Sequence, residues 1–289
     1  MSIDKLHEKI RKLKSPVMVD FGVDAGCIPQ NILEEEGSLL PAWVRLCREI
    51  MDKLEGSIPA VRFPFDGFAL YGPEGLNALS ALLSEAQNRG YYVLLDGPAV
   101  LSPWAAERAA QRIFDGGEYP CDALLISPYI GSDAVKPFLP YCKSGEKALF
   151  LAVRTPNKTA LELQDLLTGT RLVHGAAAEL VNRHGEGMYG KCGYSRIAAA
   201  ASAGNPNSLR ALRTAHNRMF LLVDGLDYPS GNAKNCSFAF DQFGYGAVVS
   251  VGPEIVAAWK ASEGIAPAEA AVQAAERIKK NLLRYVTIL

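Results

Sequence analysis

The feature that most constrains this chain is a repeated alternation of short apolar segments with longer segments of helical period. Runs rich in Val, Leu, Ile and Ala recur along nearly the whole sequence. A strand with one solvent-exposed face alternates apolar and polar residues, and most of these runs do not. Uninterrupted apolar runs are typical of parallel strands that are buried on both sides. The alternation therefore predicts βα units around a parallel sheet.

Eight such units can be counted. They predict an α/β fold, a single (β/α)8 TIM barrel spanning residues 1–289, with an extra N-terminal helix and an extra C-terminal helix. The predicted strands are Val17–Phe21, Ala60–Pro64, Tyr91–Asp96, Ala123–Ser127, Ala148–Val153, Ser195–Ala201, Arg218–Val223 and Gly246–Ser250. The predicted helices are Met1–Lys14, Pro41–Leu54, Gly75–Arg89, Pro103–Phe114, Ser132–Tyr141, Thr159–Leu167 with Ala176–Arg183, Asn207–Ala215, Pro253–Ser262 and Pro267–Tyr285.

Composition and charge exclude several classes of function. Hydrophobic residues make up 49% of the chain, so it can bury a core. The 30 Lys and Arg are balanced by 31 Asp and Glu, so no basic excess points to nucleic acid. The apolar stretches are shorter than the ~20 residues that cross a bilayer, and the charged N-terminus lacks the apolar core of an export signal. We expect a cytoplasmic protein without nucleic-acid or membrane partners.

The cysteines and histidines give no sign of a metal or cofactor. The six cysteines include no Cys-x-x-Cys pair, and the four histidines have no partner at ligand spacing. We interpret the cysteines as reduced thiols, and we expect no metal and no cofactor.

A barrel would place ligand chemistry at the carboxyl ends of its strands, because the βα loops converge on that face. Several charged and polar residues follow the predicted strands and are therefore candidates for a site. They are Asp20–Asp24, Arg62, Asp66, Asp96, Ser127, Tyr129, Arg154–Asn157, Asp224, Asp227 and Ser250–Pro253.

Four groups of motifs occur in order along nearly the whole chain. They are Ile58-Pro59-Ala60-Val61, Ser127-Pro128-Tyr129-Ile130-Gly131-Ser132-Asp133 with Lys136-Pro137-Phe138, Arg154-Thr155-Pro156-Asn157 with Gln164-Asp165, and Gly193-Tyr194-Ser195. Each motif is weak alone, but in this order and at these intervals they resemble the long-chain bacterial branch of the orotidine 5′-monophosphate decarboxylase family. The resemblance implies a barrel that forms homodimers and an ancestral role in pyrimidine biosynthesis, where the family makes UMP.

The resemblance also shows where the family's charged chemistry has been replaced. The family uses a lysine after the second strand and an Asp-x-Lys-x-x-Asp array after the third, in which ammonium groups stabilise and protonate a carbanion. Here the first lysine falls on Arg62, and the array runs from Asp96 to Leu101. Asp96 survives, whereas Pro98 replaces the lysine and Leu101 replaces the aspartate that crosses the dimer interface. Arginine does not release its proton in proteins, so proton delivery is missing.

The phosphate-binding segments of the family are also altered. Its Gln after strand seven and its Arg before the eighth helix are both absent, and the acidic Asp224 and Asp227 stand in the first of these segments. The position of the family's ribose-binding aspartate falls near Gly22, between Asp20 and Asp24. We therefore do not expect tight binding of a nucleoside monophosphate.

The surviving candidates each have a structural alternative. Asp96 and Arg62 are remnants of a catalytic set, and an ion pair between them is favoured over a catalytic role. Ser127, Thr155, Asn157 and Gly225 are predicted to bind ligand, although Ser127 and Asn157 could instead cap the following turn or helix. The aromatic run Phe63, Phe65, Phe68 and Tyr71 could line a pocket but more commonly packs beneath a loop.

The leading hypothesis is a catalytically silent paralogue that acts as a dimeric binding scaffold. Its partners would be a second copy of itself, or an intact decarboxylase in a heterodimer, and a small anionic ligand at the carboxyl-terminal face of the barrel. The alternative is an enzyme of altered chemistry on a different small anionic ligand, or one with residual decarboxylase activity.

Overall fold

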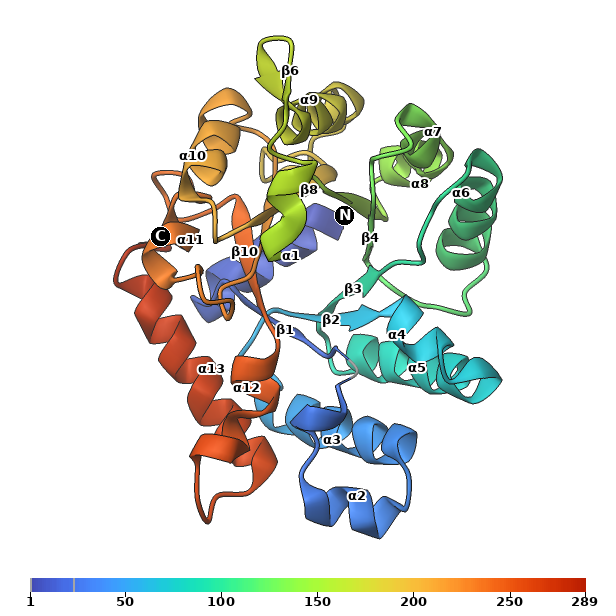
Figure 1. Cartoon of the computed structure of the whole chain (residues 1–289), viewed down its shortest axis with the longest axis vertical. Coiled ribbons are helices and arrows are strands. Elements are labelled where there is room, and N and C mark those ends of the chain that lie inside the picture. The colour runs from blue at the N-terminus through green and yellow to red at the C-terminus, as the bar shows by residue number, and fades with distance from the viewer. Residues whose placement is uncertain (1, 23) are drawn as a thin grey trace.

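The computed structural model describes residues 2–22 and 24–289, so Met1 and Val23, which fall within two of the predicted segments, lie outside the description. Over the described residues, eight parallel strands close into a barrel in the order β1-β10-β9-β8-β5-β4-β3-β2 (Figure 1). This confirms the (β/α)8 prediction. The strands are β1 (Val17–Asp20), β2 (Ala60–Pro64), β3 (Tyr92–Asp96), β4 (Ala123–Ile126), β5 (Ala148–Ala152), β8 (Ile197–Ser202), β9 (Leu221–Asp224) and β10 (Ala247–Val251).

The strand register brings the charged strand ends to one rim. Asp20 of β1 is level with Arg62 of β2, and Pro64 of β2 is level with Asp96 of β3. On the other side of the barrel, Asp224 of β9 ends level with Ser202 of β8. Residues far apart in sequence therefore meet at the carboxyl ends of the strands.

Helices surround the barrel and connect successive strands (Figure 1). Most predicted helices are present within a few residues of their expected bounds. The α-helices are α1 (Ser2–Leu13), α2 (Gln30–Glu36), α3 (Leu39–Leu54), α4 (Phe65–Ala69), α5 (Gly72–Asn88), α6 (Pro103–Ala109), α7 (Ser132–Val135), α8 (Leu139–Ser144), α9 (Val173–Gly185), α10 (Pro206–Ala215), α11 (Ala233–Ser237), α12 (Pro253–Val256) and α13 (Pro267–Leu283).

The extra N-terminal helix α1 closes the end of the barrel opposite to the strands' carboxyl ends. Ser2 Oγ lies 3.0 Å from the hydroxyl of Tyr92, the first residue of β3. Lys5 Nζ lies 2.8 Å from a carboxylate oxygen of Asp122, immediately before β4. These contacts tie the amphipathic helix across the strand starts.

Large apolar side chains pack both inside the barrel and between its strands and the surrounding helices. Phe21 and Phe63 stack with ring centroids 5.1 Å apart, and Phe150 meets Phe220 edge to face. Such dense packing is what an eight-stranded barrel requires, because its interior is a core and not a pore. Within the described part of the chain, no helix is both long and apolar enough to cross a bilayer.

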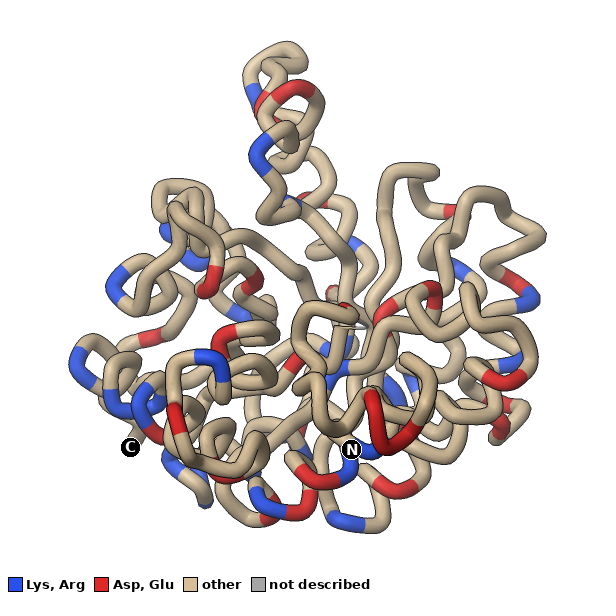
Figure 2. The backbone as a smooth tube through the Cα atoms, turned by 60° about the horizontal axis from the view of Figure 1, so that its bottom comes forward, with Lys and Arg blue, Asp and Glu red and all other residues tan. Residues whose placement is uncertain are grey.

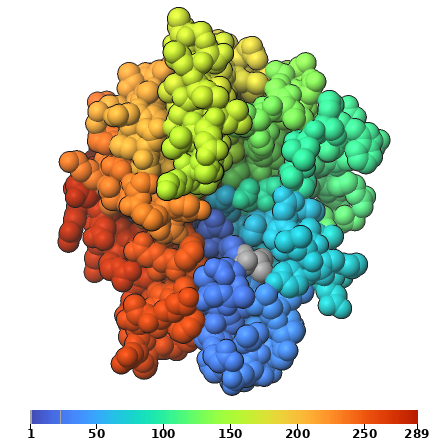
Figure 3. Space-filling model, viewed as in Figure 1, coloured from blue at the N-terminus to red at the C-terminus, as the bar shows by residue number. Residues whose placement is uncertain are grey.

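The helix predicted at Thr159–Leu167 is wrong. The structure has a short 3-10 helix at Lys158–Glu162 and then a hairpin of two short strands, β6 (Leu167–Thr168) and β7 (Arg171–Leu172). Gly169 supplies the left-handed turn with φ of +64°. The apolar residues that suggested a helix face solvent and not a core, so no packing stabilises a helix there. Figure 3 shows this yellow-green segment standing out in front of the barrel.

Two other predicted helices are broken. Ser132–Tyr141 becomes α7, a 3-10 turn at Lys136–Phe138, and α8. Pro137 and Pro140 lack the backbone N–H that a continuous helix needs. Pro253–Ser262 likewise becomes α12 followed by a 3-10 helix.

Candidate functional site

A cavity of about 660 Å³ lies at the carboxyl ends of the barrel strands. This is the face on which a (β/α)8 barrel carries its ligands. The six residues interpreted above as catalytic remnants or ligand contacts line this cavity: Arg62, Asp96, Ser127, Thr155, Asn157 and Gly225. Two other candidates from the strand ends, Tyr129 and Arg154, are not part of its lining. The proximity of the six is thus established, and their functional roles remain predictions.

Arg62 is held at the centre of the site by three carboxylates. Its Nη1 lies 2.7 Å from Oδ1 of Asp224 and 3.4 Å from Oδ2 of Asp20. Its Nε donates to Oδ2 of Asp96 at 3.1 Å, which is the ion pair that the sequence favoured. The hydroxyl of Ser250 also accepts from Nη1, at 3.3 Å. The Arg62 side chain is only 12% exposed, so its donors are directed into this cluster and not toward solvent.

Negative charge dominates the walls of the cavity. Burial and the nearby carboxylates raise the pKa of Asp20 to about 7, even though Arg62 acts in the opposite direction. Burial also raises the pKa of Asp224. Among the described residues that line the cavity, Arg62 is the sole lysine, arginine or histidine, against six aspartates: Asp20, Asp24, Asp66, Asp96, Asp224 and Asp227.

The segment that the resemblance aligned with a phosphate-binding run makes a contact within this protein. Asp227 Oδ2 accepts a hydrogen bond from the backbone N–H of Gly252 at 3.1 Å. That amide precedes α12, where free N–H groups would otherwise favour an anion. Glu254 in the first turn of α12 points to Arg277, with 3.3 Å between Nη2 and Oε1. The charge balance of the cavity therefore opposes the small anionic ligand that the sequence suggested.

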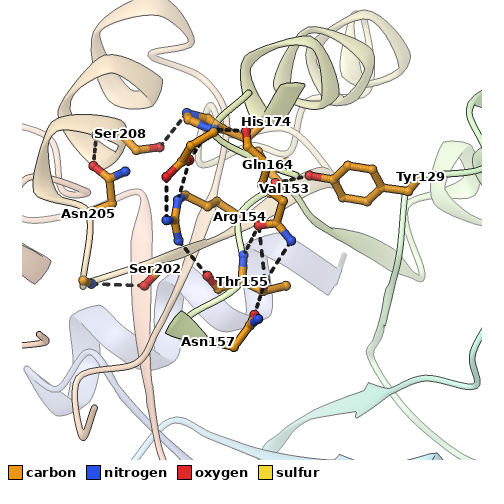
Figure 4. A network of polar contacts seen from close by, with 12 residues as sticks. Tyr129, Val153, Arg154, Thr155, Asn157, Gln164, His174, Ser202, Asn205 and Ser208 are labelled. Atoms are coloured by element: carbon orange, nitrogen blue, oxygen red, sulfur yellow. Dashed lines mark hydrogen bonds and ion pairs between the residues drawn. The ribbon is translucent and has the colours of Figure 1, made fainter. Parts of the chain in front are cut away.

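A polar network fixes the loop after β5, one wall of the cavity (Figure 4). Arg154 forms a bidentate pair with Asp165, with Nε–Oδ1 and Nη2–Oδ2 distances of 2.9 and 2.8 Å. His174 Nδ1 lies 3.1 Å from Asp165 Oδ1, and its Nε2 lies 3.2 Å from Ser208 Oγ. The loop is thus tied to both α9 and α10.

The Ser208, His174 and Asp165 contacts have the order of a hydrolytic triad, but their surroundings indicate a structural role. Ser208 and His174 are 6% exposed, and neither lines the cavity. The backbone N–H of Ser208 is bonded to the side chain of Asn205, which caps α10. A nucleophile must meet its substrate, so this buried serine is a packing contact.

The remaining predicted ligand residues make local bonds. Ser127 Oγ accepts from the N–H of Tyr129 at 3.4 Å, and Asn157 Nδ2 donates to Thr159 Oγ1 at 3.1 Å. These are the turn contacts given above as the structural alternative. Gly225 has φ of +79°, and a Cβ there would lie 2.7 Å from Cβ of Pro156, so glycine is needed where the two loops meet.

Sequence reasoning missed two aromatic residues of the cavity, Trp43 and Tyr228. Trp43 lies on α3, within a helical pattern that gave no reason to separate it from ordinary core residues. The aromatic run after β2 follows its structural alternative: Phe63 and Phe68 are fully buried and pack at ring-centroid distance 6.5 Å.

The chain is similar in sequence and in fold to known proteins. No family model matches it. An orotidine 5′-phosphate decarboxylase from Rhodopirellula baltica is 31% identical over 235 residues, which is 80% of this chain and 78% of the relative. One from Clostridium novyi is 28% identical, over 90% of each chain. The solved structure of Leishmania donovani OMP decarboxylase has a TM-score of 0.72 at 24% identity, covering 98% of both chains, and supports the fold. The chain belongs to the orotidine 5′-phosphate decarboxylase family.

Proposed function

We propose that this family member does not decarboxylate orotidine 5′-monophosphate and acts by binding a ligand within a dimeric barrel. The observation that carries the proposal is the position of Arg62. It stands where the resemblance puts a catalytic lysine, and it is bound to Asp20, Asp96 and Asp224.

A proton donor is needed to complete decarboxylation, and Arg62 is unsuited to that step. Although burial acts in the opposite direction, the carboxylates of Asp224, Asp20 and Asp96 raise the pKa of Arg62 well above its ordinary value. A guanidinium so held stays charged and does not transfer its proton. Asp96, the surviving aspartate, is occupied by Arg62 through Oδ2.

No lysine compensates for this loss among the described residues that line the cavity. Pro98 lines the cavity at the position where the resemblance puts the protonating lysine. The side chain of Leu101, at the position of the aspartate that crosses the family's dimer interface, is 76% exposed. A homodimer would therefore bring an apolar side chain to the neighbouring site, and not a carboxylate.

The dimer itself is proposed from the same loop. Leu101 and Trp104 are exposed large apolar side chains close together in sequence on the rim of the barrel. Exposed apolar clusters of this kind favour a protein contact. The proposed partner is a second copy of the chain, and an intact decarboxylase of the same cell is the heterodimeric alternative.

The test is UMP formation from orotidine 5′-monophosphate by protein purified from a host that lacks its own decarboxylase. We expect no turnover above buffer. Arg62→Gln serves as the matched variant, because a contaminating enzyme would give the same rate in both preparations. Turnover that is present in the wild type and absent in Arg62→Gln would refute the proposal and support an enzyme of altered or residual activity.

A further inference from the structure

Two side chains of α9 converge on one hydroxyl of the neighbouring helix α7 (Figure 1). His184 Nε2 lies 3.0 Å from Oγ of Ser132, and Arg183 Nη2 donates to the same oxygen at 3.4 Å. Ser132 and His184 are half-buried, whereas Arg183 is exposed. None of the three lines the cavity at the strand ends, so the cluster is a separate feature of the outer surface.

Positive charge collects around Ser132. Burial of the imidazole, together with the cations of Arg183 on its own helix and Lys136 on the facing 3-10 turn, lowers the pKa of His184. The ring is therefore neutral at neutral pH and lies near two fixed positive charges. Asp133 opposes these cations, but it lies 3.8 Å from Lys136 and both side chains are more than half exposed, so solvent screens that pair.

Arg183 keeps most of its donors free. In the described part of the chain it forms no ion pair with Asp or Glu, and its side chain bonds to Ser132. Arg171 gives the contrast, because it is paired with Glu179 of α9. A guanidinium has five N–H donors in a planar fork, so donors of Arg183 remain open to solvent or to a ligand.

The donor set identifies the class of ligand. A guanidinium fork matches two oxygens of a phosphoryl group, and imidazole and hydroxyl groups add single hydrogen bonds. A cation would be repelled by Arg183 and Lys136, and a neutral molecule would leave their charge unmatched. The contact between Ser132 and His184 could serve only to join the two helices, but that role requires neither Arg183 nor Lys136.

The geometry points to a binding site for a phosphate monoester between α7 and α9, in which Ser132, Arg183 and His184 contact the phosphoryl oxygens and Lys136 adds charge. The site lies apart from the cavity at the strand ends, where six aspartates oppose an anion. It goes beyond the proposed function, because it gives the protein a second ligand whether or not the barrel is catalytically silent.

Inorganic phosphate is the probe for this site. The full chain is titrated with sodium phosphate at neutral pH, and the ring-proton NMR signals of its four histidines are followed, with sodium chloride at matched ionic strength as the reference. The signal that disappears in His184→Gln identifies His184. We expect this signal to shift saturably with phosphate and not with chloride. No shift, or an equal shift with chloride, would overturn the inference.

Variants locate the bound phosphate by calorimetry. Arg183→Gln removes a charged donor and should weaken phosphate binding about tenfold. Arg11→Gln is the matched control, since it removes the same charge from a second basic cluster, in which Arg11, Lys12 and Lys14 line another pocket. It should bind as the wild type does, and circular dichroism checks that both variants are folded. Phosphate affinity that is unchanged in Arg183→Gln, or lost in Arg11→Gln, would refute the site.

Sulfate tests the contact with His184, because its charge stays constant over the range in which histidine titrates. Protonated His184 adds a cation to the site, so sulfate affinity should rise as pH falls through the pKa of His184. His184→Gln retains a side-chain donor and should bind sulfate with little dependence on pH. The same pH dependence in wild type and in His184→Gln would contradict a ligand held by His184.

Discussion

Arg62 Nη1 lies 2.7 Å from Asp224 Oδ1, although β2 and β9 are separated in the barrel by β1 and β10. The ion pair therefore spans the mouth of the barrel. Figure 2 shows Lys and Arg interspersed with Asp and Glu over the rest of the chain, whereas the strand ends gather mainly aspartates around this arginine. The pair joins strands β2 and β9 across the mouth of the barrel.

Removing the arginine should destabilise the fold. Arg62→Met leaves Asp20, Asp96 and Asp224 without their cation, and breaking a buried pair in this way costs about 3–5 kcal/mol. Urea unfolding followed by circular dichroism measures the change. Arg112→Met is the control, because Arg112 pairs with Glu118 at a 66% exposed site and should change the free energy of unfolding by about 1 kcal/mol or less. Equal effects would contradict a stabilising role for the central cluster.

Stability should depend on pH through Asp20. The unfolded carboxyl has its ordinary pKa of 3.8, whereas the folded one titrates at about 7. Between these values the folded protein holds a proton that the unfolded chain has lost, so the free energy of unfolding falls as pH rises, by an amount on the order of 2–4 kcal/mol. Asp20→Asn should abolish this contribution, and its melting temperature relative to wild type should be higher at pH above 7 than at pH near 4. The same difference at both pH values would rule out the raised pKa.

The network of Figure 4 should stabilise the loop after β5. Arg154 holds the pKa of Asp165 below its ordinary value through their hydrogen bonds. Asp165→Asn removes that charge from a largely buried arginine and should cost about 1–3 kcal/mol in urea unfolding. Asp133→Asn, whose partner Lys136 is 3.8 Å away on the surface, should be nearly neutral. If both substitutions proved neutral, the network would have no stabilising effect.

The predicted dimer can be tested at its exposed apolar loop. We expect wild-type protein to sediment as a dimer and Leu101→Glu with Trp104→Glu to sediment as a monomer, because charges at the centre of an apolar contact are costly. Leu289→Glu changes an equally apolar side chain, 60% exposed at the C-terminus, and should remain dimeric. A wild-type monomer, or a double variant that stays dimeric, would disprove this interface.

The strand pattern was predictable because a parallel strand buried on both faces must be apolar throughout. The Ala-rich segment of β8 and the Leu-rich segment of β4 carry that requirement in their residues alone. The Arg62–Asp96 pair was also predictable, since both residues lie near the carboxyl ends of neighbouring strands. The segment Thr159–Leu167 was not, because its helical pattern has no core to pack against.

The sequence by itself determined the barrel, since apolar segments recur at regular intervals, and the resemblance aligned Arg62, Pro98 and Leu101 with the family's lysine and aspartate positions. Only the tertiary structure decided that Asp20 and Asp224 join Asp96 around Arg62, and that Asp227 takes the amide of Gly252. These contacts join residues up to 162 positions apart. Closure of the barrel brings these residues together, and a local sequence pattern cannot predict the distance between residues so far apart in the chain.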